Sequence, residues 1–361
     1  MRQSRLFNDT EAYMIALIGY GVLDKKPDNI PPSALVDWDK MMDFAAAQGV
    51  LGWVWDGICK LPKDDQPPRQ QAINWGLSAQ GIWDRYKKQK RVLMQMIDIC
   101  NQNNIRLLLF KGIALSELFP RPESRPSSDI DIYLFEDYKR GDQIFAKENV
   151  TRTNKRTGFD YQGVHIENHR IFLNAYKKKQ VNAIRYLESS LKDIRLTKDG
   201  YYIMSPIANI VYQVMHFLAH LDDISNPLSL RFVVDFGVSM TQYKDFIHPM
   251  ELKAVLDSLK ITEPFCLLLR LVDIIMGIDL DCYTFKRIER EDCESVINLI
   301  KSRPMQSVSL YSKSFIERVK MYSSHYIKFN RLFKYMFQNR IEYVLKSMRE
   351  LFSVSVRSII K

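Results

Sequence analysis

The sequence predicts an α+β fold, with a small mixed β-sheet placed between helical regions at both ends of the chain. Apolar residues recur at three- and four-residue spacing through residues 1–104 and again after residue 205, as in amphipathic helices. Short apolar runs bounded by Gly, Pro, Asn and Asp fall within residues 105–204, as in strands. We expect helices to cover one side of the sheet.

Four parts of the chain are expected from these patterns. The 361 residues are enough for two or three domains. The parts are an N-terminal helical region (1–104), an α/β core (105–204), a helical domain (205–310) and a basic amphipathic helical tail (311–361).

The N-terminal region reads as helices separated by Pro- and Gly-containing turns. The predicted helices are residues 12–22, 39–48, 51–59 and 70–102. Residues 13–23 resemble the apolar core of a signal peptide, but Asp9 and Glu11 precede them and no small-residue cleavage pattern follows. The apolar stretch is also too short to span a bilayer. We therefore expect a buried helix and a cytoplasmic protein.

The α/β core alternates between strand and helix patterns. Strands are predicted at residues 105–110, 129–135, 151–154, 161–172 and 201–204, and helices at 112–118, 136–148 and 183–191. The following region is predicted to be helical at residues 207–221, 229–243, 249–259, 263–277 and 289–301.

The positive charge of the chain is concentrated at its C-terminal end. The net charge is +10, and residues 301–361 hold 13 Lys and Arg against three Glu, so the rest of the chain is balanced. The tail suits an anionic membrane surface, which would make the protein peripheral to a membrane, or the phosphates of nucleic acid. An amphipathic helix packed on the body explains the same pattern. The five cysteines are scattered without a CxxC pair, which indicates free thiols in a reducing compartment.

Asp129 and Asp131 are the most informative pair in the sequence. Side chains alternate along a strand, so the two carboxylates share one face while Ile130 and Ile132 share the other. Carboxylates one pleat apart repel each other, and Mg²⁺ with oxygen ligands is the natural counter-charge. A third carboxylate would complete a two-metal site for phosphoryl or nucleotidyl transfer. Glu167 is the best candidate and Asp160 a weaker one.

A phosphate-binding element is predicted just before this strand. Gly112 follows a strand and begins a helix, which lets the backbone and its free N–H groups approach a phosphate. Lys111, Arg121 and Arg125 could neutralise phosphate charge, and Arg125 is favoured because it lies four residues before the aspartates.

The segments LFKGIALSELFPRPESRPSSDIDIYL, IENHRIF, MHFLAH and LRFVVDFGVSM together resemble an uncharacterised bacterial nucleotidyltransferase family. This family is similar to the superfamily that includes DNA polymerase beta, and the matching parts span residues 105–240. The resemblance implies that Asp129, Asp131 and Glu167 bind two Mg²⁺ ions. It also implies an NTP as substrate, held by Lys111, Gly112 and Arg125, and an unidentified hydroxyl acceptor.

The chain departs from the superfamily in two places. Ile113 stands where a serine usually follows the glycine, and the gap between Gly112 and Asp129 is longer than usual. An alternative is therefore a catalytically inactive binding protein with the same fold, which recognises a nucleotide, a nucleic acid or a membrane-associated partner.

Five further side chains are candidates for supporting roles. His165 and His169 are expected on the same strand face as Glu167, where they would orient ligands. His216 and His220 are four residues apart on a predicted helix, followed by Asp222 and Asp223, which suits either packed histidines or a second metal site. Arg231, on the next helix, could reach a nucleotide or acceptor.

Overall fold

The computed structural model describes residues 6–24, 26, 32–173, 178–221 and 228–302, together with Leu332 and Tyr335. Its helices are α1 (Asp9–Leu23), α2 (Trp38–Gln48), α3 (Leu51–Ile58), α4 (Arg69–Gln102), α5 (Gly112–Ser116), α6 (Tyr138–Phe145), α7 (Lys178–Ser189), α8 (Pro206–Leu221), α9 (Leu230–Tyr243), α10 (Pro249–Leu259), α11 (Thr262–Met276) and α12 (Arg290–Lys301). Its strands are β1 (Leu108–Leu109), β2 (Asp129–Tyr133), β3 (Glu148–Arg152), β4 (Arg156–Tyr161), β5 (Val164–His169), β6 (Arg195–Leu196) and β7 (Tyr202–Ile203).

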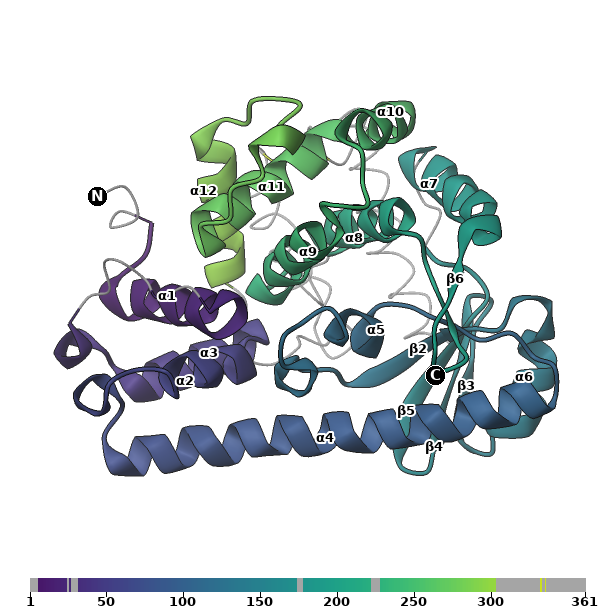
Figure 1. Ribbon diagram of the computed structural model, residues 1–361, viewed down its shortest axis with the longest axis horizontal. Coiled ribbons are helices and arrows are strands. Elements are labelled where there is room, and N and C mark those ends of the chain that lie inside the picture. The colour runs from purple at the N-terminus through teal and green to yellow at the C-terminus, as the bar shows by residue number, and fades with distance from the viewer. Residues whose placement is uncertain are drawn as a thin grey trace, which may run out of the picture.

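The strands form one mixed sheet in the order β3-β4-β5-β2-β1-β7-β6. β2 pairs parallel with β5, and β1 pairs parallel with β7, while the other neighbours are antiparallel. The predicted α+β fold with a small mixed sheet between helical regions is therefore confirmed (Figure 1).

One predicted strand is a hairpin in the structure. Residues 161–172 were expected to form a single strand, but β4 ends at Tyr161 and β5 begins at Val164. Gln162 and Gly163 both have positive φ, 51° and 69°, as in the tight turns that suit a two-residue hairpin. Glutamine is a weak turn signal at such a position. The strand pattern predicted over residues 161–172 therefore continues across the turn.

Helices cover both faces of the sheet, so the expectation of helices on one side is wrong. Leu107, Leu109, Ile130 and Ile132 pack against the C-terminal half of α4. The intervening residues of β1 and β2 face the other way, and the Phe110 ring lies edge-on to Tyr212 of α8, with ring centroids 5.6 Å apart. Strand alternation supplies both faces with apolar side chains.

The helix α4 is the longest element, with 34 residues, or about 50 Å at 1.5 Å per residue. It runs along one side of the molecule, from α2 and α3 at one end to the sheet at the other (Figure 1). Its residues 92–100 belong to the core of the sheet, whereas α1, α3, α9 and α11 share a second core. The N-terminal helical region and the α/β core were expected to meet at residue 105. The end of α4, just before this boundary, packs on the sheet of the core.

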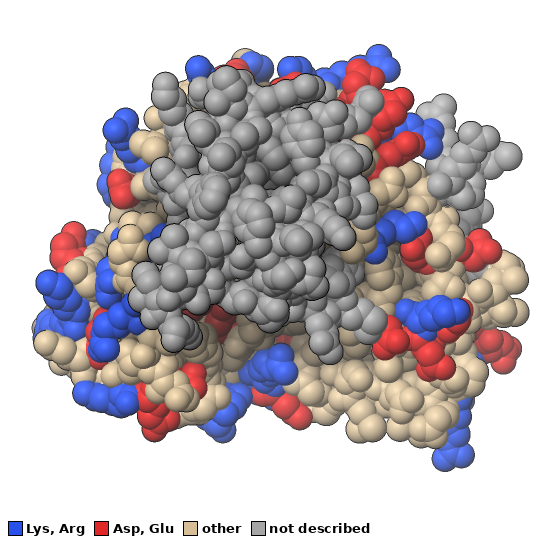
Figure 2. Space-filling view, turned by 180° about the vertical axis from the view of Figure 1, so that it is seen from behind, with Lys and Arg blue, Asp and Glu red and all other residues tan. Residues whose placement is uncertain are grey.

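Much of the basic tail lies outside the described residues, so its proposed binding to membrane or nucleic acid stays a prediction. The two tail residues that are described, Leu332 and Tyr335, are buried. The Tyr335 hydroxyl donates to Asp292 Oδ2 at 2.6 Å, so the tail contacts the body there. On the described part of the face in Figure 2, acidic and basic side chains are interspersed. No helix within the described ranges is long and apolar enough to cross a membrane.

Gly52 marks a contact that holds the N-terminal helices against the loop before β2. A Cβ at this position would lie 2.1 Å from the Ser124 carbonyl oxygen, so only glycine lets α3 approach this loop. A Cβ at Gly81, inside α4, would meet nothing within 4 Å.

We expect Gly52→Ala to lower the free energy of unfolding by about 2 kcal/mol or more, because backbone atoms must move to admit the methyl group. The matched variant Gly81→Ala should raise it by roughly 0.5–1 kcal/mol, because alanine is the better helix former. Urea unfolding of both variants measures the difference. Equal stabilities would contradict the close approach of α3 to Ser124.

Candidate active site

Parallel pairing of β2 with β5 brings the predicted carboxylates together. Asp131 lies opposite Glu167 in the register, and Asp129 lies opposite His165. Side chains that are paired across neighbouring strands point to the same face. Asp129 and Asp131 share one face, as strand alternation predicted, and the register places Glu167 on the same face, which is the one that α8 covers.

Asp131 is the centre of the cluster and is buried, with 4% of its surface exposed. Its Oδ1 accepts hydrogen bonds from Lys111 Nζ at 3.2 Å and from His169 Nε2 at 2.8 Å. Burial alone would raise the pKa of Asp131, but the Lys111 charge and the His169 hydrogen bond lower it to about 2. Burial opposes the charge on Lys111, but Asp131 holds its pKa above the usual value. The two groups therefore form a buried ion pair.

Glu167 is buried beside Asp131 and has its own nitrogen partners. His169 Nε2 lies 3.2 Å from Glu167 Oε2, and a terminal nitrogen of Arg156 lies 3.0 Å from Oε1. His169 thus stands between the two carboxylates. Sequence reasoning gave His169 a supporting role, whereas its ring nitrogen lies among the possible metal ligands. Its spacing of two residues from Glu167 on one strand is the signal for this.

Asp131, Glu167 and His169 could together hold a metal ion. Each offers one ligand atom, and these atoms all lie within 4.8 Å of one another. Among the described residues, no other group of three His, Cys, Asp or Glu side chains has ligand atoms that lie this close together. Carboxylate oxygens with an imidazole nitrogen suit a divalent cation.

Asp129 lies at the more open end of the same face. Its Oδ1 accepts a hydrogen bond from the Ser128 hydroxyl at 3.2 Å. Burial raises the pKa of Asp129, and the negative charges of Asp131 and Glu167 raise it further. A cation bound near Asp129 would relieve this repulsion, so the electrostatics of the site favour one.

Lys111 and Gly112 form a tight turn that brings the start of α5 against β2. Both have positive φ, 56° and 22°, which is unusual for a lysine. A Cβ at Gly112 would lie 2.9 Å from Ser127 Oγ and 3.3 Å from the Asp129 carbonyl oxygen, so only glycine fits. Ile113 is buried in the sheet core, so the serine hydroxyl that usually follows the glycine is replaced here by an apolar contact. The hydroxyl of Ser127 lies beside Gly112 instead.

Arg125 has protein partners in place of a phosphate. Its Nε and one terminal nitrogen donate to the two oxygens of Asp235 in α9, both at 2.7 Å. The other terminal nitrogen donates to the Gly112 carbonyl at 2.8 Å. The side chain is 4% exposed. In this structure Arg125 therefore ties the loop before β2 to α9 and to the turn at Gly112.

The other candidates have partners outside the cluster of Asp131, Glu167 and His169. His165 is exposed, and its Nδ1 lies 2.9 Å from Asp160 Oδ1 at the open edge of the face. Asp160 is thus engaged away from Asp131. An Arg231 terminal nitrogen donates to the Pro126 carbonyl at 3.4 Å, in the same loop that Arg125 holds.

The histidines of α8 form a packed pair. His216 Nε2 and His220 Nε2 are 3.1 Å apart, with Phe232 of α9 against both rings. Burial, then the proximity of His220, holds the pKa of His216 well below its usual value, so the ring is neutral. Asp222 and Asp223, the other residues of the suggested second metal site, lie outside the described residues.

Tyr212 is a site residue that sequence reasoning missed. It lies one turn before His216 on α8, and its hydroxyl is buried without a hydrogen-bond partner among the described residues. Burial raises the pKa of Tyr212 to about 12, and the charges of Lys111, Asp131 and Glu167 also act on this pKa. The hydroxyl is therefore close to the carboxylate cluster. In the sequence, Tyr212 is one position of an apolar helix pattern, and nothing in that pattern indicates that it lies near the carboxylates.

One comparison with known proteins identifies a family. A family model described as "Uncharacterised nucleotidyltransferase" matches residues 34–277, which include the turn at Gly112 and all three carboxylates. No curated protein and no solved structure matches the chain significantly.

The buried pair of Arg125 and Asp235 should be important for stability. We expect Asp235→Asn to lower the free energy of unfolding by about 3–5 kcal/mol, because it leaves a buried guanidinium without a counter-charge. Asp273→Asn, which removes the exposed ion pair with Arg270, should change it by about 0.5 kcal/mol at most. Urea unfolding of the two variants checks this. Similar losses in both would show that Arg125 is not buried with Asp235.

Proposed function

Because the chain belongs to this family of uncharacterised nucleotidyltransferases, we propose that it transfers a nucleoside monophosphate from an NTP to a hydroxyl acceptor, with release of pyrophosphate. The observation that supports this most directly is the pairing of Asp131 with Glu167 on adjacent parallel strands. Asp129 lies on the same face, and the backbone of Gly112 packs against its strand.

We assign divalent cations, Mg²⁺ in a two-ion arrangement, to Asp129, Asp131 and Glu167, with His169 as a further ligand. The donor set fits such ions, because the ligand atoms of Asp131, Glu167 and His169 lie within 4.8 Å of one another. The raised pKa of Asp129 marks uncompensated negative charge beside them. Bound ions would neutralise phosphate charge and favour loss of the proton of the acceptor hydroxyl.

The remaining roles follow from the side chains around this set. Lys111 supplies a compact positive charge that can turn from Asp131 to the phosphates of the NTP. Gly112 allows the phosphates to approach the backbone. The acceptor hydroxyl loses its proton beside Glu167. Arg125 positions the loop and Gly112 through the contacts described above, and the acceptor is unidentified.

The first test is activity. We expect Asp131→Asn to reduce nucleotidyl transfer from labelled NTP by on the order of 100-fold or more, because it removes a charge at the reacting centre. Asp160→Asn, which alters a half-buried carboxylate on β4 that is paired with His165, should retain nearly full transfer. Transfer is followed by mass spectrometry of acceptor pools. Full activity of Asp131→Asn would refute the assignment.

The second test is metal binding, measured without substrate. Mg²⁺ or Mn²⁺ at about 100 times its dissociation constant should raise the free energy of unfolding by about 2.7 kcal/mol. The response should be lost in Glu167→Gln and weakened in His169→Gln, and retained in Asp160→Asn. Isothermal titration with Mg²⁺, Mn²⁺ and Zn²⁺ shows which ion is preferred. A wild-type protein that binds none of them contradicts the proposed metal site.

A non-catalytic binding protein is the second candidate, and one observation favours it. The carboxylates already have partners within the chain, namely the cations Lys111 and Arg156 and the ring of His169. Incubation with all four labelled NTPs, divalent ions and cell-extract acceptors separates the two candidates. NTP binding without any labelled product would favour this candidate.

A further inference from the structure

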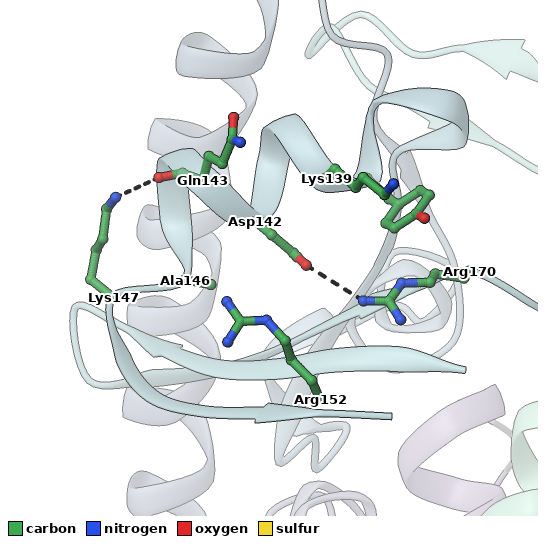
Figure 3. A pocket seen from close by; sticks show the side chains of 8 residues that line it. Lys139, Asp142, Gln143, Ala146, Lys147, Arg152 and Arg170 are labelled. Carbon is green, nitrogen blue, oxygen red and sulfur yellow. Dashed lines mark hydrogen bonds and ion pairs between the residues drawn. The ribbon is translucent and has the colours of Figure 1, made fainter. Parts of the chain in front are cut away.

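A second site lies on the opposite side of the sheet from the carboxylates. There α6 and the edge strand β3 enclose a hollow of about 600 Å³ (Figure 3). Its lining residues are Tyr138, Lys139, Asp142, Gln143, Ala146, Lys147, Arg152 and Arg170. Thr151 of β3 is in register with Gly158, which is in register with Glu167. The next residue, Arg152, therefore faces away from Glu167, into the hollow.

The hollow carries an excess of positive charge. Four of its lining residues are Lys or Arg and one is Asp. The single carboxylate, Asp142, is already engaged, because its Oδ2 accepts from Thr157 at 2.7 Å and its Oδ1 accepts from Asn168 at 2.8 Å. Arg170 lies 3.6 Å from the same carboxylate. Asp142 therefore offsets at most one of the four positive charges.

The remaining cations are available for a ligand. Lys147 Nζ donates to the backbone carbonyl of Gln143, which carries no net charge. Lys139 and Arg152 have no ion-pair partner in the part of the chain that the structure describes. In Figure 3 the Arg152 side chain extends from its strand toward the helix that carries Asp142 and Ala146. Three positively charged side chains thus line one hollow, and none of them forms an ion pair with another described residue.

The floor of the hollow is held in place by fixed contacts. Arg170 donates to the Thr153 carbonyl at 2.6 Å and to Thr157 Oγ1 at 2.8 Å, and its guanidinium lies 4.8 Å from the centre of the Tyr138 ring. Its Nε has no hydrogen-bond partner within the described residues. The guanidinium is thus positioned before any ligand arrives, which lowers the entropic cost of binding.

We propose that this hollow binds a small molecule with at least two anionic groups of the phosphate class. A volume of about 600 Å³ is within the range of small-molecule pockets. Guanidinium groups match the geometry of phosphate oxygens, and Arg152 and Arg170 supply two of them. An extended polyanion fits less well, because Asp137 and Glu148 immediately flank Tyr138 and Lys147 in the chain and would repel it.

This site is separate from the proposed NTP site, although the two meet in β5. His169 faces the carboxylates, while its neighbours Asn168 and Arg170 contact Asp142 on the other side. The proposal does not rest on nucleotidyl transfer, and it would hold for a protein without that activity.

The test is titration calorimetry with inorganic pyrophosphate at low ionic strength and with EDTA, so that no divalent ion can bring pyrophosphate to the carboxylates. We expect binding by the wild type, and a loss of affinity of about tenfold or more in each of Arg152→Gln and Lys139→Gln. Both side chains are exposed, so the variants should fold, which their thermal unfolding midpoints verify. Arg287→Gln, an exposed arginine just before α12, is the matched control and should bind like the wild type.

A further variant locates the binding. Lys111→Met removes the cation that the proposed NTP site, on the other side of the sheet, would offer to pyrophosphate. Loss of binding in Lys111→Met, with full binding in Arg152→Gln, would place pyrophosphate at the carboxylate face and overturn the proposal. So would no binding by the wild type. Tighter binding of a single-stranded oligonucleotide that also depends on Arg152 would replace the small ligand with a nucleic acid.

Discussion

Electrostatic repulsion on one face of the sheet is the constraint that organises this molecule. The register of β2 and β5 places Asp131 directly opposite Glu167, and Asp129 adds a third carboxylate one pleat away. A buried cluster of this kind is costly unless cations lie close to it. Lys111 and Arg156 supply that charge, and His169 adds a hydrogen bond to Asp131. The same arrangement that stabilises the free protein therefore prepares a place where incoming cations are favoured.

The cations can take their places only because the backbone comes unusually close at a few points. Gly112 lets the turn before α5 lie against β2, and Gly52 lets α3 lie against the loop that precedes β2. Arg125 then joins this loop, the turn and α9 through one guanidinium. The sequence between Gly112 and β2 is longer than is usual in the superfamily that the chain resembles. These contacts explain how a long loop can still hold a fixed shape. Positioning of the site thus depends on residues from both helical regions as well as on the sheet.

Local patterns predicted the elements and the carboxylate face well. Alternation along β2 is a property of the strand itself, so the shared face of Asp129 and Asp131 could be inferred before any contact was known, whereas the alignment of Glu167 with them depends on the register of β5. Contacts between distant elements could not be inferred in this way. The pairing of Arg125 with Asp235 joins residues 110 positions apart, and nothing near Arg125 in the sequence distinguishes this partner from a phosphate. Tyr212 and the basic hollow beneath α6 depend in the same manner on how helices pack over the sheet.

The position of the N-terminal helices has a consequence for the order in which the chain can fold during synthesis. The end of α4 and the strands it covers are close in sequence, so this unit can assemble soon after it emerges. The first helices also have nearby partners, because α1 packs closely against α3, but some of their contacts are distant. Gln48 donates to the carbonyl of Ile300, and Lys301 pairs with Glu11, at sequence separations of 252 and 290. The contacts of α1 and α2 with α11 and α12 can therefore form only after those two helices have been made.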